Sequence, residues 1–129
     1  MARPSADPER PRRLLVVDDH AGFRASVRLL LEHGPYEVIG EAADGASGVE
    51  AAATLHPDVV LLDIALPDLD GFEVTRRLLA SGSQAIIVLV SSRDARDYGG
   101  RVERSGAHGF IPKARLTGNA ISTVMEQAG

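Results

Sequence analysis

Five polar residues, at four separate places in the chain, each come at or just past the end of a short apolar run. They are Asp18, Asp19, Asp63, Ser91 and Lys113. Carboxylates held close together raise one another's pKa unless a cation lies among them. Carboxylate oxygens are the ligands that Mg²⁺ prefers, and a divalent cation with a fixed lysine charge lets an anionic phosphoryl donor approach. Because a carboxylate can itself attack phosphorus, these residues predict metal-assisted phosphoryl transfer onto an aspartate.

Whether these residues meet depends on the elements that position them. Short continuous apolar runs, typical of strands buried on both faces, alternate with segments of helical apolar spacing. The expected strands cover residues 14–17, 36–42, 59–62, 85–90 and 109–111, each followed by a helix. Five such units imply an α/β fold with a parallel sheet and helices on both faces. Sites in such sheets lie beyond the carboxyl ends of the strands, so four strands would deliver the polar residues to one edge.

The fourth expected helix, over residues 94–105, contains two glycines in its middle. They are Gly99 and Gly100. Each glycine costs about 1 kcal/mol relative to alanine inside a helix. We therefore predict a helix that is unusually labile before any activation.

Composition limits the class of protein. The 129 residues suffice for one domain, expected over residues 13–127 after a flexible tail, residues 1–12, that lacks apolar periodicity. The absence of cysteine excludes disulfides and thiolate chemistry. The longest apolar run has six residues, against the roughly 18 of a membrane-spanning helix, and a net charge of −4 gives no general attraction to nucleic acid. We expect a cytoplasmic domain that binds neither membrane nor nucleic acid.

Each polar residue also has an interpretation that needs no chemistry. Asp18 or Asp19 could cap the first helix, since aspartate is favoured at that position. Asp63 could bond the amides of its own turn, Ser91 could be a strand-end polar group, and Lys113 a solvated loop lysine. No two of the four histidines have the spacing of metal ligands on one face, so zinc is not expected. The shared placement at the ends of four strands favours the chemical interpretation, because independent caps need not produce it.

With these residues in place, the chain resembles the receiver domain of the response regulators of bacterial two-component systems. The matching segments are LLVVDDH at 14–20, VVLLDIALPDLDG at 59–71, IIVLVSS at 86–92 and SGAHGFIPK at 105–113. Pro67 and Gly71 follow Asp63 at the family's usual offsets, and Lys113 lies 22 residues after Ser91, also a usual interval. The DDH opening is most similar to receivers whose proteins often carry a C-terminal helix-turn-helix DNA-binding domain.

The resemblance implies a role for each residue. Asp63 would accept a phosphoryl group from a phosphohistidine of a sensor histidine kinase. Mg²⁺ would be held by Asp18, Asp19, Asp63 and the backbone carbonyl of Ala65. Lys113 would contact the phosphoryl oxygens. The implied fold is flavodoxin-like and doubly wound, with five parallel strands in the order 2-1-3-4-5 and five helices. Such a domain is a signalling module that assists its own phosphorylation and dephosphorylation and is not otherwise an enzyme.

The resemblance also implies a switch. Ser91 matches the position whose hydroxyl moves toward the new phosphate, and Phe110 matches the aromatic residue whose rotation accompanies that movement. Phosphorylation adds about −1.5 to −2 charges, which is the physical cause of the change. The face formed by the fourth helix, the fifth strand and the fifth helix would then control an output domain or partner, or form a homodimer.

Three other functions share parts of this pattern. A phosphatase of the haloacid-dehalogenase kind would need a second aspartate two residues after the nucleophile, but Ala65 occupies that place after Asp63. A flavin-binding domain would need a phosphate loop rich in hydroxyls and glycine after the first strand, where the acidic pair would repel the flavin phosphate. A pseudo-receiver that takes no phosphate would lack an acidic residue or the lysine, and this chain has all of them. We therefore expect a phosphorylatable receiver.

Overall fold

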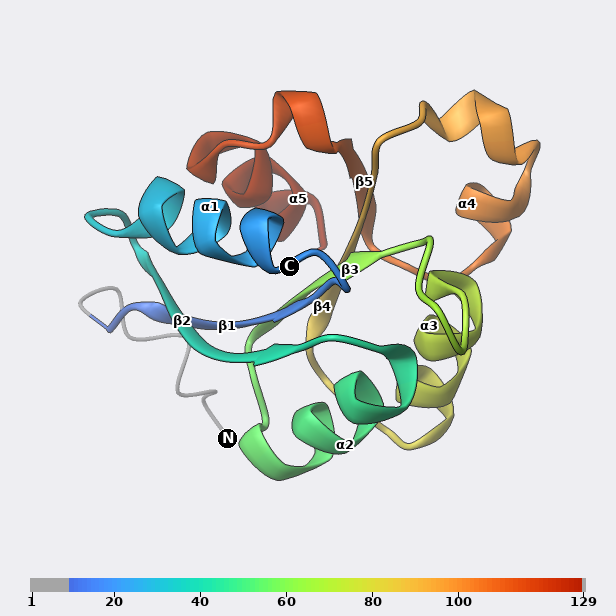
Figure 1. The fold of residues 1–129 in the computed structure, drawn as a ribbon, viewed down its shortest axis with the longest axis horizontal. Coiled ribbons are helices and arrows are strands. Elements are labelled where there is room, and N and C mark those ends of the chain that lie inside the picture. The colour runs from blue at the N-terminus through green and yellow to red at the C-terminus, as the bar shows by residue number, and fades with distance from the viewer. Residues whose placement is uncertain (1–9, 129) are drawn as a thin grey trace.

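Five parallel strands form the centre of the fold and lie in the order β2-β1-β3-β4-β5 (Figure 1). The computed structural model describes residues 10–128. The strands are β1 (Arg12–Val17), β2 (Tyr36–Ala42), β3 (Val59–Asp63), β4 (Ile86–Ser91) and β5 (Gly109–Pro112). The flavodoxin-like strand order expected from the sequence is confirmed.

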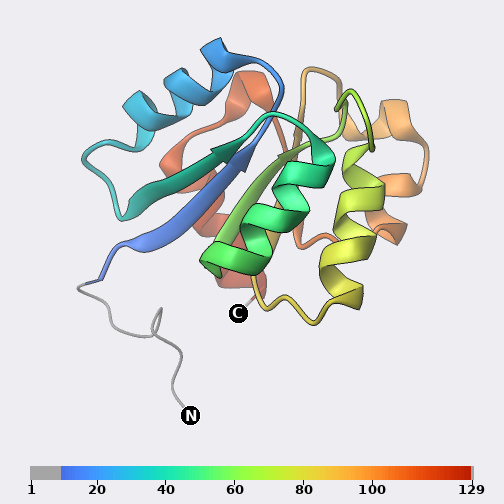
Figure 2. The same ribbon diagram turned by 60° about the horizontal axis from the view of Figure 1, so that its bottom comes forward.

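Helices cover both faces of this sheet. They are α1 (Ala21–Leu31), α2 (Gly45–Leu55), α3 (Gly71–Ala80), α4 (Arg101–Arg104) and α5 (Gly118–Ala128), with 3-10 helices at Ala95–Tyr98 and Lys113–Arg115. α1 and α5 pack on one face, whereas α2 and α3 pack on the other (Figure 2). Within residues 10–128, no helix combines the length and the apolar character needed to cross a membrane.

The continuous apolar runs of the strands build two cores. In β1, Leu14 and Val16 pack on the side of α1 and α5, together with Ile121 of α5. Leu15 and Val17 alternate with them and pack on the side of α2 and α3. All four β1 side chains are fully buried. Only the first two residues of the strand, Arg12 and Arg13, are polar, and they are partly exposed. The two-sided burial of the rest explains why the next polar residue, Asp18, comes only past the carboxyl end of the strand.

The chain after β4 differs from the predicted single helix over residues 94–105. It forms the 3-10 helix Ala95–Tyr98, a break, and a four-residue α4. At the break, Gly99 has a φ of +61°, a conformation that glycine adopts without steric cost but that no α-helix contains. The prediction of one continuous helix is therefore wrong, and glycine is the reason. The lability proposed for this segment stays a prediction.

Most of the predicted N-terminal tail, residues 1–9, lies outside the described part of the chain. Arg12, the last residue assigned to the tail, already pairs with Tyr36 in the sheet. Its backbone amide also donates a hydrogen bond to the carbonyl of Pro35, 2.7 Å away. The ordered strand thus begins one residue before the predicted domain start at residue 13.

Candidate functional site

Side chains from three strands meet at the carboxyl edge of the sheet. Asp18 follows β1 and Asp63 ends β3, and these two residues are 0% and 2% exposed. Lys113 follows β5 and places its Nζ 2.6 Å from Asp18 Oδ2 and 3.5 Å from Asp63 Oδ2. The only lysine of the chain therefore contacts both buried carboxylates at the edge of the sheet where the sequence predicted the three residues to lie.

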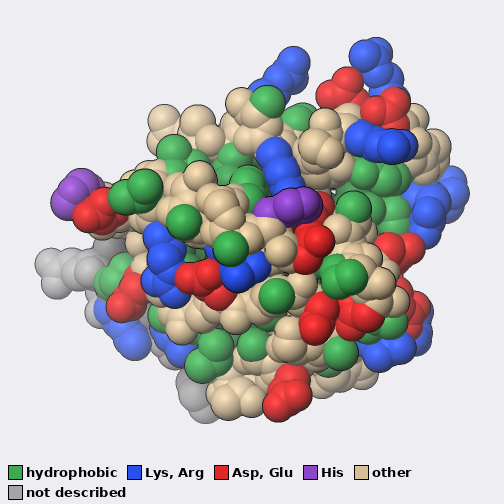
Figure 3. Space-filling view, viewed as in Figure 1, with side chains coloured by type: hydrophobic (Ala, Val, Ile, Leu, Met, Phe, Trp, Pro, Cys, Tyr) green, Lys and Arg blue, Asp and Glu red, His purple; other side chains and the backbone are tan. Residues whose placement is uncertain are grey.

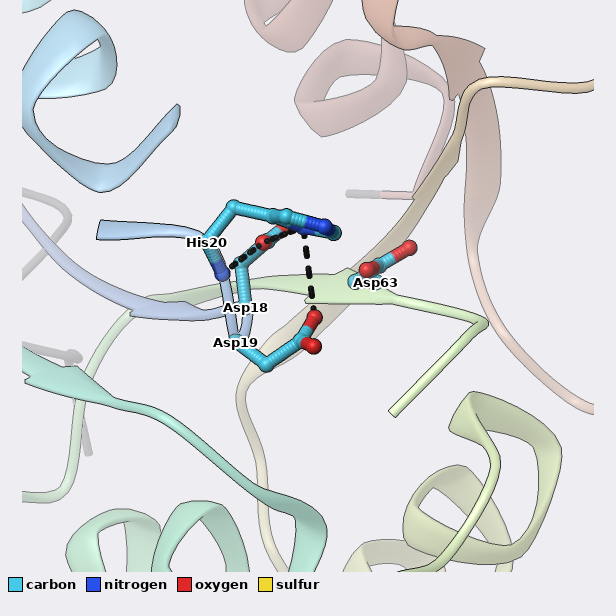
Figure 4. Close-up of side chains that lie close together, drawn as sticks. All are labelled: Asp18, Asp19, His20 and Asp63. Atoms are coloured by element: carbon cyan, nitrogen blue, oxygen red, sulfur yellow. Dashed lines mark hydrogen bonds and ion pairs between the residues drawn. The ribbon is translucent and has the colours of Figure 1, made fainter. Parts of the chain in front are cut away.

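Two further residues of the loop after β1 complete the cluster (Figure 4). Ligand atoms of Asp18, Asp19, His20 and Asp63 all lie within 4.8 Å of one another. His20 Nδ1 lies 3.0 Å from Asp18 Oδ1 and 3.2 Å from Asp19 Oδ1. The residue at the N-cap of α1 is His20, so neither aspartate holds the capping position that was the alternative for them. Sequence analysis did not place His20 at the site.

The two buried carboxylates have opposite pKa shifts. Burial alone would raise the pKa of Asp18, but the Lys113 ammonium and the backbone amide of His20 outweigh it and hold that pKa below the usual 3.8. Burial, and next the negative charge of Asp18, raise the pKa of Asp63 to about 6, against the attraction of Lys113. The shorter distance from Lys113 to Asp18 and the 2.8 Å hydrogen bond from the His20 amide contribute to the asymmetry. Asp63 is thus the electrostatically strained member of the pair.

The cluster carries more negative charge than its own cation offsets. Lys113 supplies one positive charge against three carboxylates, those of Asp18, Asp19 and Asp63. Asp18 Oδ2 is buried and accepts no hydrogen bond of good geometry, although the Lys113 ammonium is close to it. Oxygens with free lone pairs beside uncompensated negative charge are suited to a hard divalent cation. The site can therefore hold such a cation between the loops after β1 and β3.

Arg24 of α1 fixes the backbone at the acidic pair. Its Nη1 donates a hydrogen bond of 2.6 Å to the carbonyl of Asp18. Its Nε also pairs with Glu41 Oε1 of β2 at 2.8 Å. Arg24 therefore ties the loop that presents the carboxylates to both α1 and β2. Sequence analysis missed this role, because Glu41 is 17 residues away along the chain.

The loop from β3 to α3 explains the fixed spacing of glycine after the buried aspartate. The amide of Gly71 donates to the carbonyl of Ile64 at 2.8 Å. A Cβ atom on Gly71 would lie only 2.7 Å from the carbonyl oxygen of Asp63, so only glycine permits this approach. The amide of Ala65 donates to Asp63 Oδ1 at 3.3 Å. The turn thereby holds the Asp63 side chain, while the metal-binding role of the Ala65 carbonyl stays a prediction.

Ser91 ends β4 beside this cluster, but its hydroxyl is engaged elsewhere. Ser91 Oγ accepts a hydrogen bond of 3.0 Å from the backbone amide of Arg93. It also shares a hydrogen bond of 2.5 Å with the hydroxyl of Tyr98. Neither Arg93 nor Tyr98 belongs to the acidic cluster of Asp18, Asp19, His20 and Asp63. Phe110 of β5 packs its ring against Tyr98, with 6.5 Å between the centroids. Sequence analysis named Ser91 and Phe110 but missed Tyr98, which contacts both.

The surface around the site has no uniform sign of charge. Acidic and basic side chains are interspersed over the face shown in Figure 3. Charged residues near the site also form local ion pairs, such as Arg101 with Asp70 at 3.2 Å. This face therefore presents no continuous basic surface of the kind that binds nucleic acid.

Known proteins share both the sequence pattern and the fold. Residues 14–124 match the family model described as the response regulator receiver domain. The DNA-binding transcriptional activator EvgA of Escherichia coli K12 is 32% identical over 110 residues, which cover 85% of this chain and 54% of EvgA. BvgA of Bordetella pertussis, named as a transcription regulator of virulence factors, is 38% identical over 101 residues, or 78% of this chain and 48% of BvgA.

Solved structures agree with these relatives. The signal receiver domain of NarL, named as a response regulator of Mycobacterium tuberculosis, superposes with a TM-score of 0.80 at 30% identity. The match covers 90% of this chain and 98% of that domain. The chain thus spans about half the length of the curated relatives it matches, but nearly all of a solved receiver domain.

Proposed function

The chain belongs to the receiver domain family of two-component response regulators, and from this premise we propose that it accepts a phosphoryl group on Asp63 with Mg²⁺. The observation that carries the proposal is the contact of one lysine with two buried carboxylates at the sheet edge. Of these carboxylates, Asp63 is the one whose negative charge is least stabilised, as its raised pKa indicates. A basic, poorly stabilised carboxylate is a better nucleophile than one held by strong hydrogen bonds.

The proposed reaction is a transfer from a phosphohistidine of a sensor histidine kinase. A carboxylate oxygen of Asp63 attacks the phosphorus, so that an O–P bond forms while the P–N bond breaks. The leaving imidazole nitrogen keeps the electron pair of the broken bond and takes a proton from water, which leaves hydroxide in the solvent. The products are an aspartyl phosphate and a neutral histidine.

The residues around Asp63 fit a magnesium ion. We propose that Asp18, Asp19 and Asp63 hold it, with the backbone carbonyl of Ala65. When bound, Mg²⁺ supplies positive charge that offsets the repulsion between the carboxylates and the incoming phosphoryl oxygens. Lys113 already contacts the Asp63 side chain and would bind a phosphoryl oxygen there. Arg24 and the turn at Gly71 keep the two acidic loops in position.

The output of the domain is proposed from its relatives. EvgA is named as a DNA-binding activator and is about twice as long as the match to this chain. We propose that phosphorylation changes the face formed by the segment after β4, by β5 and by α5, which then controls an output domain, a partner or a homodimer. In this role the chain is a signalling module and catalyses no other reaction, and the cytoplasm stays its predicted compartment.

The metal requirement gives a first test, with Asp19→Asn. We expect aspartyl-phosphate formation from acetyl phosphate to saturate with Mg²⁺ in the wild type and to stop when EDTA is added. Because Asp19→Asn removes one anionic ligand without disturbing the buried pair, half-saturation should need about tenfold more Mg²⁺ or higher. The phosphorylation rate is measured across a magnesium titration.

A matched control for this test is Glu32→Gln, which removes one negative charge from an exposed residue outside the cluster. It should leave the magnesium dependence unchanged. A wild type that takes no phosphoryl group at saturating Mg²⁺ would contradict the proposed function. Equal magnesium dependence of Asp19→Asn and the wild type would contradict the metal assignment alone.

A further inference from the structure

Tyr98 holds the hydroxyl of Ser91, the residue at the end of the strand next to Asp63. The two hydroxyl oxygens are 2.5 Å apart and join the last residue of β4 to the last residue of the 3-10 helix that follows it. A serine hydroxyl has one donor and two acceptor positions. One acceptor position of Ser91 Oγ already takes the amide of Arg93. When Ser91 is the donor to Tyr98, its single hydroxyl proton is engaged, so Ser91 can donate to a group on Asp63 only by releasing Tyr98.

Tyr98 is itself fixed by an aromatic cluster between α3 and β5. Its ring packs edge-on against Phe72 with 5.7 Å between centroids, and against Phe110 at 6.5 Å. The guanidinium of Arg101 covers the Phe72 ring at 4.4 Å and also pairs with Asp70. These ring contacts place the Tyr98 hydroxyl beside Ser91.

The same tyrosine ends the 3-10 helix Ala95–Tyr98, directly before the break at Gly99. A residue with a positive φ interrupts the helical hydrogen bonds, so this 3-10 helix is not continuous with α4. The segment can therefore move as a unit without unwinding a longer helix. Loss of the bond to Ser91 would remove the hydrogen bond that attaches its last residue to β4.

We propose that Tyr98 is the positioning residue of the Ser91 hydroxyl: its hydrogen bond holds Ser91 away from Asp63 until a phosphoryl group competes for it. This inference rests on the proposed phosphorylation of Asp63. On phosphorylation, Ser91 exchanges the Tyr98 hydroxyl for a phosphoryl oxygen, and the freed 3-10 helix alters the surface next to β5. The hydrogen bond between Ser91 and Tyr98 thereby couples phosphorylation of Asp63 to the surface next to β5.

Tyr98→Phe tests this exchange, because it removes the hydroxyl and keeps the ring in its aromatic cluster. The probe is beryllofluoride with Mg²⁺, which stands in for the phosphoryl group without covalent chemistry. We expect Tyr98→Phe to bind beryllofluoride about fivefold more tightly than the wild type, which corresponds to about 1 kcal/mol for one hydrogen bond. In a Ser91→Ala background the same substitution should have no effect, because the partner hydroxyl is already gone.

The chain offers a matched control in Tyr36→Phe. Tyr36 also shares a hydrogen bond with a serine, Ser122 at 2.8 Å, but joins β2 to α5 away from the acidic cluster. Its loss should leave beryllofluoride affinity unchanged. Because these are the only two tyrosines, ¹³Cζ-tyrosine labelling gives two NMR signals. The Tyr98 signal should shift on beryllofluoride binding and, without beryllofluoride, in Ser91→Ala, while the Tyr36 signal stays in place.

The outcomes separate the two proposals. Wild-type protein that binds no beryllofluoride would overturn the proposed function and this inference with it. Wild-type binding with unchanged affinity in Tyr98→Phe, or an effect that persists in Ser91→Ala, would overturn the role of Tyr98 alone. A Tyr98 signal that is unmoved by Ser91→Ala would show that the two hydroxyls are not coupled, and would also overturn it.

Discussion

Asp63→Asn is expected to stabilise the magnesium-free protein by about 2 to 3 kcal/mol at neutral pH, although it removes the group on which the proposed function depends. The folded state raises the pKa of Asp63 from 3.8 to about 6, because the carboxylate is buried beside the charge of Asp18. Ionising this side chain therefore costs free energy in the folded state that it does not cost in the unfolded chain. Asparagine has nearly the same shape and carries no charge.

The sign of the pH dependence follows from the raised pKa. Between pH 3.8 and about 6 the folded protein binds more protons at Asp63 than the unfolded chain does, so this residue lowers stability as the pH rises. The penalty is complete above about pH 6 and disappears as the pH falls toward 3.8. The advantage of Asp63→Asn should therefore be largest at neutral pH and vanish in acid. Urea unfolding across this pH range measures it.

Asp18→Asn provides the matched control, since it makes the same substitution at the other buried carboxylate. The pKa of Asp18 is lowered, mainly by Lys113 and the amide of His20 against the effect of burial, so its charge stabilises the fold. Asp18→Asn should destabilise the protein where Asp63→Asn stabilises it. Added Mg²⁺ should stabilise the wild type by binding the folded state and leave Asp63→Asn nearly unchanged. A destabilised Asp63→Asn at neutral pH would contradict the assignment of Asp63 as the strained carboxylate.

Lys113→Met should have the opposite effect, with a loss of about 3 kcal/mol at neutral pH without magnesium. The ammonium is the only lysine or arginine group that forms an ion pair with either buried carboxylate among the residues that the structure describes. Its removal leaves Asp18 and Asp63 facing each other without compensation. Methionine retains an apolar stem that can pack on Phe23, whose ring centroid lies 4.3 Å from the Lys113 Nζ. The measured loss therefore reports mainly on charge.

Two further variants make this prediction specific. Arg115→Met removes a positive charge two residues away, from an exposed side chain, and should change stability by less than about 0.5 kcal/mol. In an Asp63→Asn background, the cost of Lys113→Met should be smaller, because one of the two carboxylates is already neutral. Urea unfolding of the wild type, of Asp63→Asn, of Lys113→Met and of the double variant gives the coupling energy between the two residues. A Lys113→Met cost equal to that of Arg115→Met would show that the lysine does not compensate the buried charges.

The strands and the carboxyl-edge residues could be predicted because each depends on local sequence. A strand buried on both faces must be apolar until it emerges, so Val59–Asp63 marks both the strand and the site residue at its end. Parallel order then brings the strand ends together without further information. This reasoning placed Asp18, Asp63 and Lys113 at one edge of the sheet, where the structure brings them into contact.

The wrongly predicted fourth helix and the missed roles of Tyr98 and Arg24 have one physical cause. Each depends on contacts between segments that are distant in the sequence. The break at Gly99 depends on whether surrounding contacts repay the cost of glycine in a helix, which the sequence does not state. Tyr98 reaches Ser91 only because the broken segment folds back over Phe72 and Phe110. Arg24 shows the same limit, since its link from Asp18 to Glu41 joins α1 to β2. The sequence did offer one signal for Arg24. It lies four residues after His20, one turn into α1, and therefore near the loop that carries Asp18.

The central claim, that Asp63 takes the phosphoryl group, is tested most directly by mass spectrometry of the intact protein. Wild type and Asp63→Asn are incubated with acetyl phosphate, with and without Mg²⁺. We predict one added phosphoryl group on the wild type, only with Mg²⁺, and none on Asp63→Asn. Borohydride reduction of the modified wild type should convert residue 63 to homoserine, which peptide sequencing locates. An unmodified wild type in Mg²⁺, or equal modification of Asp63→Asn, would contradict the account.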